Sequence, residues 1–188
     1  MKYNGTPTML YLNDTWSSYF HNPLDDDWRN ESYQKLIDIG SAEDFWAFQK
    51  SVGDHINNGM FFIVREHVFP CWDDPSNING GCISIKIGKE NMTEYWQRLC
   101  SKLLTETLLK KDYRNAYWSH VNGISTSPKR HFCIVKIWVA TPAISDISMF
   151  DLPFDYSGEV IYKTNISNIS MENIRITTTS SRQNISVA

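Results

Sequence analysis

The sequence predicts a single-domain α+β fold, an antiparallel sheet with helices on one face and the other face open. Three observations lead to this fold class. The chain has 188 residues, the length of one domain, and its 41% of hydrophobic residues can bury an ordinary core. Two segments repeat apolar residues at helical spacing. Several short segments around them are rich in β-branched and aromatic residues, as strands are.

The N-terminal part is expected to contribute an arm, a strand and a loop. Residues 1–15, with their turn residues, predict a flexible N-terminal arm, which leaves 16–188 for the folded domain. Trp16 to His21 alternates bulky and small side chains, as a half-buried strand does. The acidic run 25–27 then marks an exposed loop that carries Trp28.

Two amphipathic helices are expected next. The first covers about 42–56, because Ser41 and Asp44 form an S-x-x-D capping signal ahead of apolar residues at helical spacing. The second covers about 93–110, with Thr93 as its cap and an apolar stripe along one face. Helices of this kind bury one face against a sheet.

Short strands are expected between and after these helices, and the segment Cys82–Ile87 alternates most cleanly, with three isoleucines on one face. From 141 onward prolines interrupt the chain, and 177–188 is rich in Ser and Thr. The expected strands cover 60–69, 82–87, 117–127, 132–140 and 159–163.

Composition and charge exclude several classes of protein. The net charge is −3 and the pI is near 5.9, so a broad basic surface for nucleic acid is absent and any such contact must be local. No apolar run approaches the roughly 20 residues of a membrane-spanning helix. The N-terminus lacks a signal-peptide pattern, so we expect a cytoplasmic protein with reduced cysteines and unmodified N-x-S/T triplets.

The sequence offers no coherent catalytic site. Cys82 follows two glycines, and His120 or His131 could serve as its base, but the spacing matches no cysteine-hydrolase signature. The five histidines are scattered without the spacing of metal ligands, and no glycine-rich phosphate loop is present. We therefore expect a protein that is not an enzyme and has neither metal nor cofactor.

Two tryptophans in loops indicate a binding site instead. Trp28 lies in a polar loop, and Trp72 lies in a loop after a strand with Asp73 beside it. An indole face attracts a cation by about 2 kcal/mol when desolvated, and stacking of a base on an aromatic ring contributes about 1–3 kcal/mol. A neighbouring carboxylate can accept two ring N–H hydrogens. This combination suits a planar, cationic ligand that carries N–H groups.

A local basic patch adds a site for negative charge. Lys129 and Arg130 precede a strand in which Ile134, Lys136 and Trp138 share one side. A lysine and a tryptophan on the same face suit an anionic ligand that also has a ring. Taken together with the loop tryptophans, the patch indicates a modified nucleotide that carries phosphates.

These motifs resemble the eukaryotic translation initiation factor 4E family of messenger-RNA cap-binding proteins. Their order and spacing agree with the family over about 16–138, roughly two-thirds of the chain. The abundance of Asn and Ile and the divergence are of the kind expected in a viral or protist member. The residues that carry the resemblance are the Trp16 strand, Trp28, Glu43-Asp44-Phe45-Trp46, Pro70-Cys71-Trp72-Asp73-Asp74, Asn77-Ile78-Asn79-Gly80-Gly81, Trp96 and the segment from Gly123 to Trp138.

The resemblance implies a fold and a site. The fold would be a curved antiparallel sheet with helices on the convex face and the ligand pocket on the concave side, so that 16–188 is the cap-binding domain. Trp28 and Trp72 would sandwich the 7-methylguanine ring, and Asp73 would accept its N1 and N2 hydrogens. Trp138 would lie near the N7 methyl group, and Lys129 would bind phosphate.

The chain departs from the family at three pocket positions. Asp73 stands where the family usually has Glu, which is one methylene longer. Ile134 and Cys82 stand at two positions that are often basic in the family. We expect Lys136 or Arg130 to supply the missing phosphate charge.

The resemblance also implies a surface for a partner protein. Trp46 matches a family tryptophan that binds a 4G-type scaffold, but Leu10-Tyr11 replaces the usual His-Pro pair. Gln97 and Ser101 replace exposed leucines of the second helix. The scaffold, or a dedicated substitute for it, would bind here, because polar groups in place of leucines weaken a generic partner.

The function expected from the resemblance is binding of the mRNA cap and recruitment of capped mRNA for translation initiation in the cytoplasm. Two alternatives remain open at this point. One is a translational repressor that binds the cap without engaging a 4G-type scaffold. The other is a protein-interaction module whose tryptophans are core residues and which binds no nucleotide.

Overall fold

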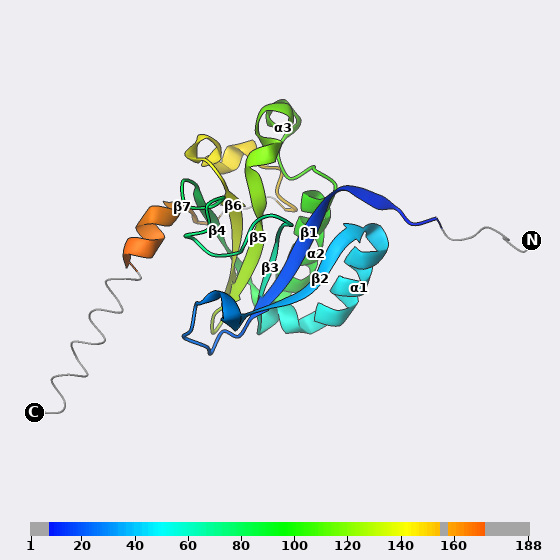
Figure 1. The fold of residues 1–188 in the computed structure, drawn as a ribbon, viewed down its shortest axis with the longest axis horizontal. Helices are drawn as coiled ribbons and strands as arrows, with labels where there is room; N and C mark the ends of the chain where they lie inside the picture. The colour runs from blue at the N-terminus through cyan, green and yellow to red at the C-terminus, as the bar shows by residue number, and fades with distance from the viewer. Residues whose placement is uncertain (1–7, 155–157, 172–188) are drawn as a thin grey trace, which may run out of the picture.

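A computed structural model of the chain describes residues 8–154 and 158–171. Within these ranges seven strands form one curved antiparallel sheet, in the order β2-β1-β3-β5-β6-β4-β7 (Figure 1). The strands are β1 (Tyr11–His21), β2 (Tyr33–Ser41), β3 (Met60–Arg65), β4 (Gly81–Gly88), β5 (Val121–Pro128), β6 (Phe132–Val139) and β7 (Val160–Thr164). The helices are α1 (Ala42–Val52), α2 (Lys89–Leu104) and α3 (Lys111–Tyr117), and 165–171 is also helical.

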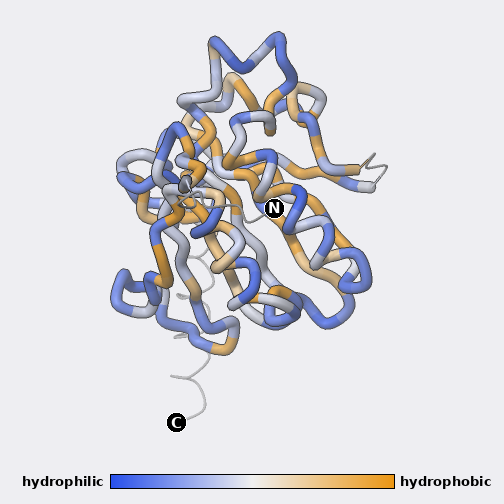
Figure 2. The backbone as a smooth tube through the Cα atoms, turned by 90° about the vertical axis from the view of Figure 1, so that its right-hand side faces the viewer, coloured by the Kyte–Doolittle hydropathy of each residue, from blue (hydrophilic) through white to orange (hydrophobic). Residues whose placement is uncertain are grey.

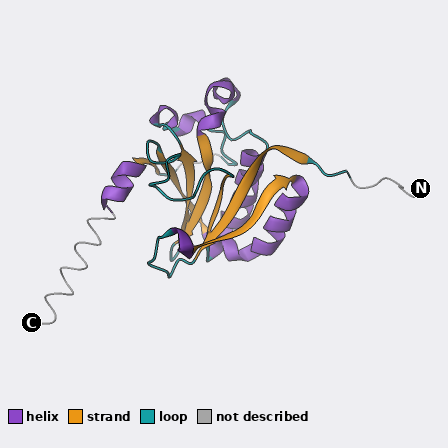
Figure 3. Cartoon of the chain, in the orientation of Figure 1, coloured by secondary structure: helices purple, strands orange, loops and turns teal. Residues whose placement is uncertain are grey.

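The main core lies between the convex face of the sheet and the helices. Figure 3 shows α1 and α2 on the same side of the sheet, and the loops in Figure 2 are mostly hydrophilic. The expected isoleucine face of β4 is confirmed, because Ile83, Ile85 and Ile87 are buried in this core. From α2, Trp96 and Leu99 pack into the same cluster. The predicted α+β class and the side covered by the helices are therefore correct.

The capping signal at the start of α1 is confirmed. The backbone N–H of Asp44 donates to Ser41 Oγ at 3.1 Å, and Ser41 Oγ donates to the Asp44 carboxylate at 2.7 Å. The helix ends at Val52 because Gly53 has a φ of 45°, a left-handed conformation that favours glycine. A 3₁₀ turn over Gly53–Asn57 completes the predicted range of 42–56.

The second helix is shifted from its predicted range of 93–110. It begins at Lys89 directly after β4 and ends at Leu104, so Thr93 lies inside it and is not its cap. Leu108 is fully buried although it lies beyond the helix. An apolar stripe continues through a loop here, and periodicity alone does not distinguish a buried loop residue from a helical one.

The N-terminal strand begins earlier than expected. β1 starts at Tyr11, so 11–15 belong to a strand and not to an arm; of the predicted arm, 1–7 lie outside the described residues. The partner strand β2 was not predicted. It is an edge strand in which buried and exposed residues do not alternate along the chain, so it lacks the pattern that identifies a half-buried strand.

The remaining strands follow the predictions, although β3 and β6 end earlier and β7 is shifted by one residue. The expected strands at 60–69, 132–140 and 159–163 correspond to β3, β6 and β7. The one expected at 117–127 begins only at Val121, because the preceding residues form the short helix α3 and a 3₁₀ turn. The Ser/Thr-rich segment 177–188 lies outside the described residues.

The concave face is only partly open. A second, small cluster of Phe62, Cys82 and Trp138 lies on this side of the sheet. The helical segment 165–171 (orange in Figure 1) covers part of it, and Asn165 is fully buried there. None of the helices in the described ranges combines the length and apolar character needed to cross a bilayer.

Candidate functional site

A cavity of about 1040 Å³ opens on the concave face. Its walls come from the loop between β1 and β2, the loop between β3 and β4, the β5–β6 hairpin, and Ile169 of the segment 165–171. It brings together six of the seven residues predicted for ligand binding, from segments far apart in the chain. These are Trp28, Trp72, Asp73, Lys129, Lys136 and Trp138.

The Trp28 wall rests on a stacked pair of rings. Trp28 lies flat on His21, with ring centroids 4.3 Å apart and an angle of 2° between the planes. His21 is fully buried at the end of β1, and its Nε2–H donates to the carbonyl oxygen of Asp27 at 2.8 Å. Since His21 covers one face of the indole and Trp28 is 43% exposed, the rest of the ring is available to a ligand.

The loop that carries Trp28 is held by an ion pair. The Arg29 guanidinium donates to both oxygens of the Asp27 carboxylate, at 3.0 and 2.7 Å. The same carboxylate accepts the Arg29 backbone N–H at 3.0 Å. These hydrogen bonds lower the pKa of Asp27 to about 2. The aspartate is therefore charged at neutral pH and fixes the backbone on both sides of Trp28.

The Trp72 wall rests on a buried amide. Asn77 donates to the carbonyl oxygens of Phe69 and Cys71 at 2.9 and 2.8 Å, which closes the loop around Trp72. Asn122 donates to Asn77 Oδ1 at 2.8 Å, and Asn165 donates to the Asn77 carbonyl oxygen at 2.7 Å. A buried polar network whose members are all paired is rigid. The loop is thus tied to β5 and to the segment 165–171.

Asp73 extends from this wall as an exposed acceptor. It follows Trp72 directly and lines the cavity. Burial and a hydrogen bond to the Asp73 carboxylate raise the pKa of the neighbouring Cys71 to about 12. The thiol is therefore protonated at neutral pH and adds no charge to this edge of the cavity.

Trp138 forms part of the cavity floor and is only 3% exposed. Its indole N–H donates to Ser125 Oγ at 2.9 Å, and its ring packs edge-on against Phe62 with centroids 6.4 Å apart. Because the N–H is already paired, the ring offers its apolar surface to a ligand. Tyr33 and Met60 extend this surface.

Two lysines and Arg29 line the cavity, and the Arg29 guanidinium is already bound to the Asp27 carboxylate. Lys129 lies in the β5–β6 hairpin, and Lys136 lies on β6 with its ammonium 5.1 Å from the centre of the Trp72 ring. The third predicted cation, Arg130, lies at the hairpin turn and is not among the residues that line the cavity. Of the two residues expected to supply the missing phosphate charge, Lys136 therefore lies in the cavity wall and Arg130 lies outside it.

The nucleophile considered for an enzyme is poorly suited to catalysis. Cys82 is buried under the concave face, and burial raises its pKa to about 12, which disfavours the thiolate. Its Sγ contacts Asn165 Oδ1 at 3.5 Å. In the described ranges, no three His, Cys, Asp or Glu side chains are grouped as a metal site requires.

The residues predicted for partner binding lie on the helical side. Trp46 is 55% exposed on α1, and Leu10 and Tyr11 are exposed beside that helix. The segment is attached there, since the Leu10 carbonyl oxygen accepts the backbone N–H of Ala42 at 2.8 Å. On α2, the Ser101 hydroxyl donates to the carbonyl oxygen of Gln97 at 2.9 Å. The hydroxyl is therefore already paired within its own helix.

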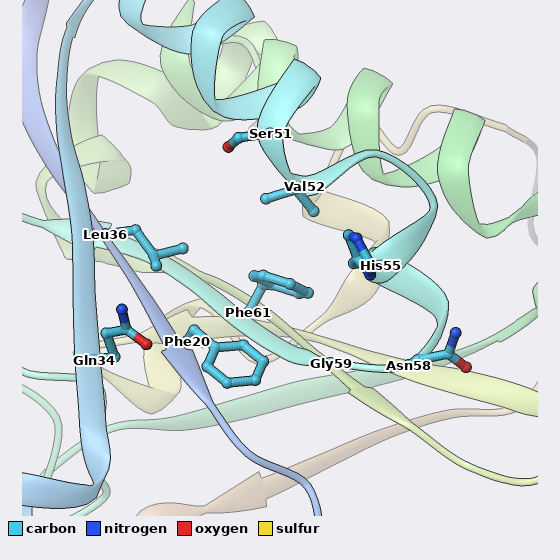
Figure 4. A pocket seen from close by; sticks show the side chains of 9 residues that line it. All are labelled: Phe20, Gln34, Leu36, Ser51, Val52, His55, Asn58, Gly59 and Phe61. Atoms are coloured by element: carbon cyan, nitrogen blue, oxygen red, sulfur yellow. The ribbon is translucent and has the colours of Figure 1, made fainter.

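A second cavity, of about 440 Å³, lies on the opposite side of the sheet. Figure 4 shows Phe20, Leu36 and Phe61 on the strand side and Val52 and His55 on the helix side. Phe20 and Phe61 pack with centroids 5.4 Å apart. Neighbouring residues of a strand point to opposite faces, so this cavity opens on the convex face and is separate from the tryptophan cavity.

Several residues of the site were not predicted. His21 and Phe62 lie in strands, where a ring is usually a core residue, and nothing in their spacing indicates a cavity. Asn77 belongs to one of the motifs that resemble the family, but its role in supporting the loop needs Asn122 and Asn165, which lie 45 and 88 residues away. Contacts over such separations depend on the fold.

Comparison with known proteins gives the family. The family model described as eukaryotic initiation factor 4E matches residues 11–150. Translation initiation factor 4E of Saccharomyces cerevisiae is 26% identical over 136 residues, which covers 68% of this chain and 60% of the yeast protein. The factor NCBP of Triticum aestivum is 29% identical over 120 residues, 58% of this chain and 47% of the wheat protein.

A viral relative and two solved structures are also similar. The initiation factor 4E homolog of Acanthamoeba polyphaga mimivirus is 30% identical over 69 residues, 36% of this chain and 24% of that protein. The C. elegans eIF4E-3 structure with the 4E-binding protein Mextli and a cap analog has a TM-score of 0.72 at 14% identity, covering 87% of this chain and 96% of that one. The Ascaris suum eIF4E-3 structure with m7G cap has a TM-score of 0.65 at 13% identity, covering 82% and 98%.

The chain thus spans about half to three-fifths of the yeast and wheat relatives, and it shares the fold of the two nematode proteins over most of its own length. The matched range 11–150 contains β1 to β6, both long helices and every predicted site residue. On this evidence the chain belongs to the eukaryotic initiation factor 4E family.

Proposed function

We propose that this protein binds the 7-methylguanosine cap of mRNA in the concave cavity. The observation that carries the proposal is that the cavity gathers two loop tryptophans, a carboxylate and two lysines in a chain of this family. The two nematode proteins of the same fold were solved with a cap analog and with m7G cap. Capped mRNA is therefore the ligand for which the chemistry of the cavity is best suited.

Recognition of the ring uses three side chains. Trp28 and Trp72 stack on the two faces of the 7-methylguanine, and methylation at N7 gives the ring a positive charge that indole faces attract. Asp73 accepts the N1 and N2 hydrogens in two charge-assisted hydrogen bonds. The shorter reach of Asp compared with Glu brings the ring one methylene deeper toward the Trp72 loop.

The phosphates are bound by lysines. Lys129 at the hairpin and Lys136 on β6 line the same cavity and supply positive charge. Ile134 and Cys82 add no charge, and Arg130 lies at the hairpin turn. The Arg29 guanidinium also lines the cavity but is already bound to Asp27, so the triphosphate is held mainly by the two lysines, and no covalent bond is made or broken.

In the cell, the protein brings capped mRNA to translation initiation in the cytoplasm by binding a 4G-type scaffold. The scaffold contacts Trp46 and the neighbouring α2 surface. A second candidate is a repressor that occupies caps without the scaffold. The observation in its favour is that α2 presents Gln97 and the paired hydroxyl of Ser101. Pull-down with a peptide of the form Y-x-x-x-x-L-hydrophobic separates the two, because only the initiation factor retains it.

Tryptophan-fluorescence titration tests cap binding. The wild type and Trp72→Ala are titrated with 7-methyl-GTP and with GTP. Strong quenching by the methylated nucleotide, absent in the variant, supports the proposal. Equal quenching by both nucleotides means that the positive charge of the ring is not recognised. No response in the wild type would leave a protein-interaction module as the remaining alternative.

A further inference from the structure

A cation of the protein itself lies on one of the two tryptophans. The Lys136 ammonium is 5.1 Å from the centre of the Trp72 ring, within the range of a cation–π interaction. Both side chains line the concave cavity. Lys136 reaches this position from β6, where its strand neighbours are the small residues Ser84 and Ser125. The indole that is expected to stack on a cationic ligand therefore already has a cation over it.

One indole face cannot hold two cations in the same position. A ring that stacks on this face of Trp72 must displace the ammonium, and like charges at that distance repel each other. Displacement costs the cation–π contact, whatever ring replaces it. A ligand that also presents phosphate beside the ring offers the ammonium a charge-assisted partner, which offsets the loss.

We propose that Lys136 couples the recognition of the ring to the recognition of the phosphates, and so makes the pocket specific for a phosphorylated ligand over the nucleoside. This inference rests on the proposed function. In the free protein the ammonium covers Trp72. In the complex it leaves the indole and binds phosphate. Lys129 lies in the hairpin and has no such contact with Trp72 among the described residues, so it binds phosphate without affecting the ring.

The coupling and simple phosphate binding predict different changes in the affinity for the nucleoside when Lys136 is removed. If Lys136 only binds phosphate, its removal leaves the affinity for 7-methylguanosine unchanged. If it also covers Trp72, its removal exposes the indole, and the nucleoside binds more tightly. The preference for a methylated over an unmethylated ring changes little, because both rings displace the same ammonium.

Calorimetric titration of Lys136→Met with 7-methylguanosine, 7-methyl-GTP and GTP tests the proposal, since methionine keeps the apolar stem and removes the charge. We expect the nucleoside to bind about threefold more tightly and 7-methyl-GTP to bind about tenfold more weakly. Lys50→Met is the matched control: it removes a charge from the last turn of α1, on the helical side of the sheet and outside the cavity lining, and should change neither affinity.

The outcomes separate the two proposals. Unchanged or weaker nucleoside binding in Lys136→Met overturns the coupling. Tighter nucleoside binding in Lys50→Met as well would assign the effect to net charge and would also overturn it. Lys136→Gln serves as a second neutral variant and should give the same sign. If wild-type protein binds no 7-methyl-GTP, the proposed function fails first, before any variant is compared.

Discussion

The two tryptophan walls of the cavity are built in different ways. Trp28 is supported by local contacts: the His21 ring beneath it and the Asp27–Arg29 pair around it lie within seven residues. Trp72 is supported through Asn77, whose own partners Asn122 and Asn165 lie 45 and 88 positions away from it in the chain. One wall is an independent loop on a strand end, and the other is part of the hydrogen-bonded frame of the domain. A substitution that disrupts the Trp72 wall should therefore lower the stability of the whole domain. One that disrupts the Trp28 wall should mainly lower the affinity for the ligand.

The largest effect is expected from Asn77→Ala. The substitution removes the hydrogen bonds of Asn77 with the Phe69 and Cys71 carbonyl oxygens and with the Asn122 amide, although the Phe69 oxygen keeps the Cys71 backbone N–H and Asn122 keeps the Ser76 carbonyl oxygen. A hydrogen bond contributes about 0.5–1.5 kcal/mol, so for the three bonds we expect a loss of roughly 2–4 kcal/mol in the free energy of unfolding. Urea denaturation measures it. Asn79→Ala, at an exposed position of the same loop, is the control and should change the stability little.

A stable Asn77→Ala protein would contradict this account of the Trp72 wall. It would mean that water replaces the amide and that the loop does not depend on the distant elements. The comparison between the two walls would then lose its main distinction.

The next effect concerns the Trp28 wall and should appear in binding more than in stability. His21→Ala removes the ring stacked on Trp28, so the indole loses its support and we expect about a tenfold loss of affinity for 7-methyl-GTP. His21→Phe restores a ring but not the hydrogen bond to the Asp27 carbonyl oxygen. We therefore expect His21→Phe to lose less affinity than His21→Ala, and fluorescence titration of both variants measures the two affinities. Equal losses in the two would show that the hydrogen bond, and not the ring, supports Trp28.

The fold was easier to predict than the site. The α1 cap, the isoleucine face of β4 and the core side of α2 follow from short-range patterns, and the structure confirms them. The edge strand β2 was missed because its exposed side chains do not alternate, and the bounds of α2 were shifted because Leu108 continues the apolar pattern beyond the helix. A short-range sequence pattern predicts which face of an element is buried better than it predicts the residue at which the element ends.

The site residues were predicted unevenly for the same physical reason. Trp28, Trp72 and Asp73 stand out because they lie in loops, where a core role does not explain an aromatic side chain. Their supports, His21 and Asn77, have ordinary local environments, and their roles come from strand pairing and distant hydrogen bonds. The contact of Lys136 with Trp72 likewise depends on how β6 lies under the β3–β4 loop.

A smaller effect, on the pKa of Asp27, is expected when the Asp27–Arg29 ion pair beside Trp28 is removed. In the wild type, Arg29 lowers the pKa of Asp27 to about 2. A carboxyl group with a lowered pKa stabilises the folded state above its ordinary range near 4, and this contribution is lost as the pH falls toward 2. In Arg29→Ala the pKa should return toward its ordinary range. Titration of the Asp27 carboxyl signal by NMR measures the change, and an unaltered pKa would exclude Arg29 as its cause.

The smallest effect probes the edge of the Trp72 wall. Burial, and then the Asp73 carboxylate, raise the pKa of Cys71 to about 12, so alkylation by iodoacetamide at pH 8 should be slow. Asp73→Asn removes the negative neighbour and lowers the pKa, and the alkylation rate of Cys71 should rise while burial keeps it below that of a free cysteine. Peptide mapping by mass spectrometry follows this residue alone. Asp26→Asn changes a carboxylate on the Trp28 side of the cavity and should leave the rate unchanged. An equal rise in the alkylation rate of both variants would mean that the thiol responds to the charge of the whole cavity. The two walls would then form one electrostatic site, even though separate parts of the chain support them.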